Sequence, residues 1–239
     1  MRRLAWTAVF VLIAASLITT VAVAKRSPGK SQPAPFKQAT LIVETNATDG
    51  DAGLQISLDH EPWRSIAIDG PDGRRLLDIT TRGVLQDYGL TELFSESSEP
   101  PFTKFPLERF KNLFPAGRYT FVGQTIGGAT FQSSVVLTHN IPAGPVISSP
   151  AQGSTVSRDD AVVRWEPVTE PAGIDIVGYQ VLVTREGPLR VFSADLPGGA
   201  TSLHIPAEFL ESGVGYKVEV LAIERGRNQT LTEVAFTTR

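Results

Sequence analysis

The sequence predicts an all-β protein built from two β-sandwiches in tandem. In the C-terminal half, apolar residues recur at every second position within short runs, which is the period of a strand with one buried face. Gly, Pro, Asn and Asp separate these runs and are typical of turns. The chain contains no cysteine, so burial of apolar side chains must stabilise both domains without disulfide bonds.

The N-terminal residues 1–24 have the organisation of an export signal. Arg2 and Arg3 precede an uncharged apolar run at residues 4–24, which ends in an Ala-Val-Ala sequence at Ala24. This pattern predicts a signal peptide cleaved after Ala24. The run is also long enough to span a bilayer as a helix, so an uncleaved membrane anchor is the alternative. Both interpretations place the remaining chain outside the cytoplasm, secreted, in a periplasm or at the cell surface.

The charge of the chain argues against a nucleic-acid partner. There are 22 basic and 25 acidic residues, and the formal charge of −3 becomes −5 once the two arginines of the leader are removed. Phosphate binding needs a basic face, and Lys and Arg cluster only within residues 25–37. Residues 25–38 contain three prolines and few large apolar side chains, which predicts a flexible linker.

Residues 39–141 are expected to form the first sandwich. Its Gly70-Pro71-Asp72-Gly73 sequence is a strong turn signal. Apolar residues at helical spacing predict a short helix at residues 107–114. The predicted strands lie at residues 40–44, 54–58, 65–68, 115–121 and 135–137.

Two prolines and a glycine at residues 139–145 predict the boundary between the domains. The second domain is expected at residues 145–239, where Trp165 lies on a strand and is suited to fill the space between two sheets. The predicted strands are residues 161–168, 178–183, 190–194, 202–205 and 216–222.

Trp165, Tyr179, Leu210 and Tyr216 follow one another on these strands in an order that resembles a fibronectin type III domain, the cysteine-free relative of the immunoglobulin sandwich. The resemblance covers the second half and implies a seven-stranded module used for spacing or adhesion, without catalysis. It also implies an entry strand at residues 145–150, a last strand at residues 228–237 and a tyrosine corner at Tyr216.

The first half repeats part of this pattern, because a helical turn, a glycine and a tyrosine precede alternating apolar residues around Tyr119. It is therefore expected to be a divergent immunoglobulin-like sandwich with a short helix. The hydroxyl of Tyr119 is expected to bond to a backbone group upstream in the chain.

The resemblance implies that the loop before the last strand, residues 224–229, is a candidate for partner binding. Arg225, Arg227 and Asn228 are the candidate contact residues, although the loop lacks an Arg-Gly-Asp sequence. The alternative interpretation is a solvated hairpin tip.

Residues 46–53 alternate acidic residues with glycine and resemble a calcium-binding loop. An EF-hand is excluded, since its obligatory glycine and glutamate positions fall on Leu54 and His60. A looser calcium site formed by Asp49, Asp51 and Asp59 is one hypothesis, and a polar turn between strands is the other.

Motifs of serine hydrolases, zinc proteases and nucleotide-binding enzymes are absent from the sequence, and the three histidines are widely spaced. We therefore expect a non-enzymatic exported interaction or scaffold protein without a cofactor, with a protein or polysaccharide partner. The alternatives are a weak calcium-binding domain and a carbohydrate-binding module that stacks Trp63, Phe102 and Phe105 on sugar rings. Exposure of those rings would favour sugar binding, and burial would favour the scaffold.

Overall fold

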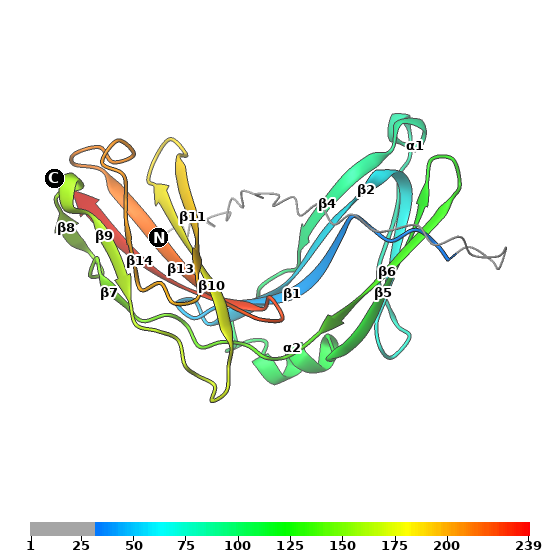
Figure 1. Cartoon of the computed structure of the whole chain (residues 1–239), viewed down its shortest axis with the longest axis horizontal. Coiled ribbons are helices and arrows are strands. Elements are labelled where there is room, and N and C mark those ends of the chain that lie inside the picture. The colour runs from blue at the N-terminus through cyan, green and yellow to red at the C-terminus, as the bar shows by residue number, and fades with distance from the viewer. Residues whose placement is uncertain (1–31) are drawn as a thin grey trace, which may run out of the picture. The chain divides into compact units, whose positions relative to one another are not determined.

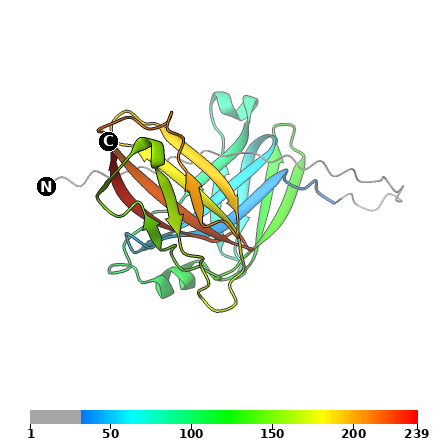
Figure 2. The same ribbon diagram turned by 60° about the vertical axis from the view of Figure 1, so that its left-hand side comes forward.

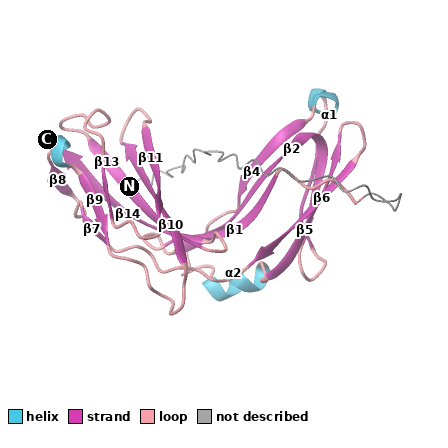
Figure 3. Cartoon of the chain, in the orientation of Figure 1, coloured by secondary structure: helices cyan, strands magenta, loops and turns pink. Residues whose placement is uncertain are grey.

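A computed structural model describes residues 32–239, of which residues 33–239 form one compact unit. Strands dominate this part of the chain and only short helices interrupt them (Figure 1, Figure 3). The predicted leader at residues 1–24 and the linker up to residue 31 lie outside the described residues. Within residues 32–239, no helix has the length and apolar character needed to cross a membrane. The predicted all-β fold class is confirmed.

The first half consists of six strands and two short helices. A single long strand, β2, takes part in two sheet segments: its first part pairs with β1 and β4, and its last part pairs with β3 and β5. The two segments enclose one core of apolar side chains. The elements are β1 Gln38–Asn46, β2 Asp51–Asp69, β3 Arg75–Thr80, α1 Val84–Tyr88, β4 Leu90–Glu96, α2 Leu107–Leu113, β5 Gly117–Thr125 and β6 Thr130–Leu137.

The structure changes two expectations for this half. Phe36, assigned to the flexible linker, is buried and packs edge-on against Phe131, so the folded part begins before Gln38. Its ring contributes apolar area to the core, which offsets the entropy of ordering the preceding residues. Strand β4 was not among the predicted strands, and its Leu90 and Leu93 pack against the same core.

The second half is a two-layer sandwich. One layer has the strand order β12-β9-β7, and the facing layer contains β11-β10-β13-β14, with β8 added at the edge of β14. Both layers contribute to a second, separate core, in which the rings of Trp165 and Tyr179 lie 5.3 Å apart. The strands are β7 Ile147–Ser149, β8 Ser154–Val156, β9 Val162–Trp165, β10 Ile176–Arg185, β11 Val191–Pro197, β12 Ser202–His204, β13 Gly215–Glu224 and β14 Gln229–Thr238.

Both predicted tyrosine contacts are present. The Tyr216 hydroxyl accepts a hydrogen bond of 2.8 Å from the backbone N–H of Glu211, and the Tyr119 hydroxyl donates one of 3.0 Å to the carbonyl of Pro115. In each half, a buried tyrosine therefore fixes the turn that leads into its own strand.

The two halves share one sheet although their cores are separate. Strand β1 pairs with β2 on one side and in parallel with β14 on the other, with Glu44, Thr45 and Asn46 opposite Gln229, Thr230 and Leu231. Backbone hydrogen bonds thus continue from one sandwich into the next, which the sequence pattern did not predict (Figure 1, Figure 2).

Candidate functional site

Several buried polar side chains join distant parts of the chain in the contact region between β1, β14 and residues 138–144, here called the junction. Asn228 at its centre has 1% of its surface exposed. Its side-chain oxygen accepts from the backbone N–H of Val43 at 2.9 Å, and its amide nitrogen lies 3.1 Å from the carbonyls of Thr138 and Asn140. One side chain of the second half therefore binds backbone groups of the first half and of the connecting segment.

Further contacts close the junction around this asparagine. The backbone N–H of Ala47 donates to the carbonyl of Leu231 at 2.9 Å, and the hydroxyl of Thr230 donates to the carbonyl of Pro142 at 2.6 Å. Gly144 packs so closely that a Cβ there would lie 2.4 Å from the side chain of Ala47. The connecting segment is thus fixed against the sheet rather than free to act as a hinge.

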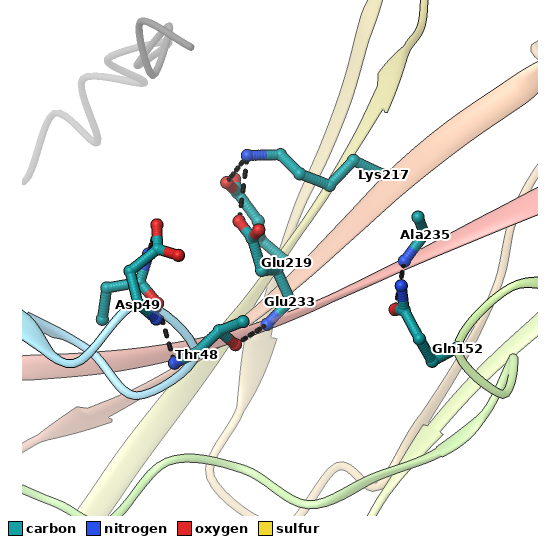
Figure 4. Close-up of polar contacts among 8 residues, drawn as sticks. Thr48, Asp49, Gln152, Lys217, Glu219, Glu233 and Ala235 are labelled. Atoms are coloured by element: carbon teal, nitrogen blue, oxygen red, sulfur yellow. Dashed lines mark hydrogen bonds and ion pairs between the residues drawn. The ribbon is translucent and has the colours of Figure 1, made fainter. Parts of the chain in front are cut away.

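Strand β14 has an open edge between the part that pairs with β1 and the part that pairs with β8. Side chains accept hydrogen bonds from the backbone N–H groups along this edge. The hydroxyl of Thr48 accepts from the N–H of Glu233 at 2.9 Å, and the side-chain oxygen of Gln152 accepts from the N–H of Ala235 at 2.8 Å (Figure 4). An unpaired strand edge is a template for pairing with another chain, and these contacts block it.

Lys217 of β13 lies beside this edge, on the face of the sheet opposite the second core. Its ammonium group is 2.6 Å from Glu219 and 3.1 Å from Glu233, so one cation forms ion pairs with two carboxylates (Figure 4). The neighbouring acidic groups raise the pKa of Lys217, although burial opposes them and is the largest single effect. Leu182, Leu221 and Leu231 form a small buried apolar cluster of their own.

Three carboxyl groups meet where β1 and β14 pair. Carboxylate oxygens of Glu44, Glu96 and Glu99 lie within 4.8 Å of one another. Gly53 lies opposite Glu44 on β2, and its missing side chain leaves the space that Glu99 occupies, because a Cβ there would lie 2.5 Å from the Glu99 carboxylate. Backbone pairing and one glycine therefore position this acidic cluster.

The environment keeps two of these carboxyl groups protonated at higher pH than usual. Burial raises the pKa of Glu44 to about 8, although the hydrogen bond from the amide of Gln229 acts in the opposite direction. Burial raises the pKa of Glu99 to about 7, and the charges of Glu96 and Asp51 add to this effect. Near neutral pH, the cluster therefore carries less negative charge than three acidic residues normally would.

Oxygen donors in this arrangement match the chemistry of hard cations such as Ca²⁺. In the structure, however, amide groups approach two of the carboxylates, since Gln229 donates to Glu44 and Gln55 donates to Glu96 at 2.9 Å. The sequence pattern did not predict this cluster. The signal that points to it is Glu44, a charged residue at the end of the apolar run 40–44, but its meaning depends on β1 having a neighbour on both sides.

The structure corrects one of the three candidate contact residues in the loop at residues 224–229. Asn228 was expected to face a partner, but it is buried and binds within the chain. Arg225 is exposed and lies 2.6 Å from Asp175, and Arg227 is exposed with a φ of 78°. The loop is thus divided between an exposed tip and a buried base at the junction.

The structure separates the three residues of the proposed calcium site. Asp51 pairs with Asn46 at one end of β1, whereas Asp59 pairs with Gln38 at the other end. Eight residues of extended strand correspond to about 27 Å, so Asp59 cannot bind the same ion as Asp49 and Asp51. The turn itself is held by Asn46, whose side-chain oxygen accepts from the backbone N–H of Asp49 at 3.0 Å.

The proposed sugar-stacking residues do not form an exposed row. Trp63 is completely buried in the first core, so its assignment as a sugar-stacking residue was wrong. Phe102 and Phe105 are partly buried and pack against the same core. These rings take part in apolar packing, because burial of aromatic surface stabilises the fold and exposure would lose that stabilisation.

Comparisons with known proteins give structural similarity alone. No family model and no curated protein matches the sequence. Among solved structures, a two-domain fibronectin type III segment of chicken tenascin is similar at 14% identity and a TM-score of 0.31, over 85% of this chain and 99% of that one. The FN1–FN3 domains of chicken CNTN1 are similar at 12% identity and a TM-score of 0.35, over 86% and 69% of the two chains. No residue role is carried over from either.

Proposed function

We propose that this protein is a non-enzymatic, exported interaction or scaffold protein. In this proposal, two sandwiches joined at a fixed junction present their loops to a protein or cell-envelope partner. The observation that carries it is Asn228, a buried side chain that ties β14 to β1 and to the connecting segment. Holding two modules at a constant spacing requires such a junction, whereas independent modules on a tether do not.

The positions of the polar side chains support a role without catalysis. The ring of His60 is stacked on Phe131 at 3.7 Å, and His139 lies 2.9 Å from the carbonyl of Phe114. Both histidines therefore take part in packing and local structure. In the acidic cluster, amides of Gln229 and Gln55 hold two of the carboxylates. General acid–base catalysis needs a group aimed at a substrate position, and these groups are aimed at one another.

Export of the mature chain is the part of the proposal that rests on the sequence. The arginines, the apolar run and the small residues before Lys25 support it. The absence of cysteine is compatible with either an oxidising or a reducing compartment, so it does not decide the location.

The test combines partner capture with a change at the junction. The full chain and its Asn228→Ala variant serve as baits in the native envelope fraction, with Asn112→Ala as the control, an identical change at an exposed position on α2. We expect the wild type and Asn112→Ala to retain a partner that Asn228→Ala loses. Cysteines introduced at the exposed positions Val136 and Leu189 allow the spacing to be measured with spin labels, because the chain has no other thiol.

We expect a narrow distance distribution in the wild type and a broad one in Asn228→Ala. If the distribution broadens while the partner is still captured, the fixed spacing has no role in binding. If the chain captures no partner under any condition, or turns over a substrate, the interaction function itself is refuted. Retained near-ultraviolet circular dichroism in Asn228→Ala would show that both sandwiches remain folded.

A further inference from the structure

A buried carboxyl group lies in the short strand pairing that joins the two halves. Strand β1 pairs with β14 over three residue positions, and Glu44 opposite Gln229 is the first of them. Glu44 has 3% of its surface exposed, and the side-chain amide of Gln229 donates a hydrogen bond to its carboxylate. The protonation of one side chain is thus tied to the contact between β1 and β14.

Two further carboxyl groups face Glu44 from neighbouring segments. Glu96 ends β4, and Glu99 follows in the loop after it. Carboxylate oxygens of the three residues lie within 4.8 Å of one another. The amides of Gln229 and Gln55 donate hydrogen bonds to this group but bring no positive charge. Like charges so close together repel, so the three carboxyl groups cannot all ionise without cost.

The surrounding charges do not compensate these carboxyl groups. Lys217 lies on the same face of the sheet, but it is paired with Glu219 and Glu233 (Figure 4). Within residues 32–239, no ion pair connects any of the three carboxyl groups to a basic side chain. The other charged residues that act on this region are also acidic: Asp49, Asp51 and Glu233.

Ionisation of Glu44 therefore favours an open junction. Burial raises the pKa of Glu44 to about 8, and the charges of Glu96 and Glu99 add to this effect, although the hydrogen bond from Gln229 opposes it. Below that pH, the closed junction holds a neutral carboxyl group. Above it, the closed junction must hold a buried charge among acidic neighbours, whereas separation of β14 from β1 would expose the carboxylate to water.

The junction can open without the loss of either core. Strand β1 keeps its pairing with β2, and β14 keeps its pairing with β13. The two cores have no residue in common. Opening breaks the pairing of β1 with β14 and the contacts of Asn228, including the hydrogen bond from the backbone N–H of Val43. It therefore costs less free energy than global unfolding.

We propose that the junction is a pH-sensitive switch, closed while Glu44 is protonated and opened when Glu44 ionises beside Glu96 and Glu99. The two halves are then held at a fixed spacing at acidic and neutral pH and separate at alkaline pH. This inference goes beyond the proposed function, since a rigid scaffold requires no titrating group.

The pH dependence of the switch follows from proton linkage. The closed junction retains a proton on Glu44 that the open junction, with an ordinary pKa of 4.5, releases. The ratio of open to closed junction therefore rises by about tenfold per pH unit between about pH 5 and 8, and it levels off at higher pH.

Native-state hydrogen exchange on the full chain tests the switch. The backbone N–H groups of Val43 and Ala47 donate across the junction, to the side chain of Asn228 and to a carbonyl of β14. Phe121 and Val220 lie in the first and second core and provide the reference amides. Protection factors are corrected for the intrinsic pH dependence of exchange. We expect the junction amides to be less protected than the core amides and to lose about 50-fold in protection from pH 6 to pH 8.

Three variants assign the effect to the carboxyl groups. Glu44→Gln should keep the protection of the junction amides constant over this pH range, because glutamine does not ionise. Glu99→Gln should reduce the loss of protection, since it removes one of the negative charges that face Glu44. Glu208→Gln is the control, an identical change at an exposed position of the second half, and should match the wild type.

Two results would overturn the proposal. Junction amides that exchange as slowly as the core amides at every pH would show that the junction opens only by global unfolding. An equal loss of protection in Glu44→Gln and the wild type would assign the pH dependence to another group. Failure of the chain to capture any partner would refute the scaffold function and leave the switch standing, because hydrogen exchange requires no partner.

Discussion

Glu44 is an acidic residue on a strand that has a neighbour on either side, and its environment determines its protonation. Burial raises its pKa to about 8, against an ordinary value of 4.5. The folded protein therefore retains a proton that the unfolded chain releases between these two pH values. Since the folded state binds more protons in this range, the free energy of unfolding falls as the pH rises from about 5 to 8.

The variant Glu44→Gln should flatten this pH dependence, because a glutamine does not ionise and can still accept from Gln229. Each pKa unit between the states is worth about 1.4 kcal/mol, so we expect a difference of several degrees in how far the melting temperature falls between pH 5 and pH 9. Thermal unfolding followed by circular dichroism measures it. Glu208→Gln is the control, an identical change at an exposed position. Equal slopes for Glu44→Gln and the wild type would contradict the assignment.

At the scale of the element, the two tyrosine corners show how one hydroxyl determines the start of a strand. Tyr216 is the second residue of β13, and Tyr119 lies near the start of β5. Burial raises the pKa of Tyr119 to about 12, and nearby Asp72 adds to this effect. The phenol therefore stays protonated and continues to donate to Pro115 over the whole physiological range.

Removal of either hydroxyl should destabilise the protein without changing the fold. Tyr216→Phe leaves the N–H of Glu211 without its acceptor, and Tyr119→Phe leaves the carbonyl of Pro115 without its donor. We expect a loss of about 1 kcal/mol in each case from urea denaturation. Tyr88→Phe should have no effect, since that side chain is exposed on α1. Losses no larger than that of Tyr88→Phe would show that the corners contribute nothing to stability.

At the scale of the whole molecule, the contacts at the junction determine whether the two cores unfold in one cooperative transition or in two. Each half has its own apolar core, and the two meet through the β1–β14 pairing and Asn228. Domains with separate cores move and unfold independently unless their contact is extensive. The buried amide and the shared backbone hydrogen bonds provide that contact here.

We expect wild-type residues 33–239 to unfold in a single calorimetric transition within the full chain, and Asn228→Ala to unfold in two. The substitution leaves the N–H of Val43 and the carbonyl of Asn140 without partners, and an unsatisfied buried group costs about 1–3 kcal/mol. Differential scanning calorimetry separates the two cases. Arg225→Ala removes only an exposed ion pair and should keep the single transition. One transition in Asn228→Ala would mean that the halves are coupled by other contacts.

Local signals in the sequence were sufficient to predict the fold class, most strands and the Tyr119 contact, because alternating apolar residues, turn residues and a helical turn before a tyrosine all lie within short segments. The corner at Tyr216 was predicted from the family resemblance. The roles of Trp63, Asn228 and Glu44 depend on contacts between distant segments and required the three-dimensional structure. A tryptophan next to a proline gives the same local sequence pattern whether its ring is exposed or buried. The parallel pairing of β1 with β14 joins residues 185 positions apart, and no local pattern records such a contact. The junction and the acidic cluster follow from that pairing, which is why both became visible only in three dimensions.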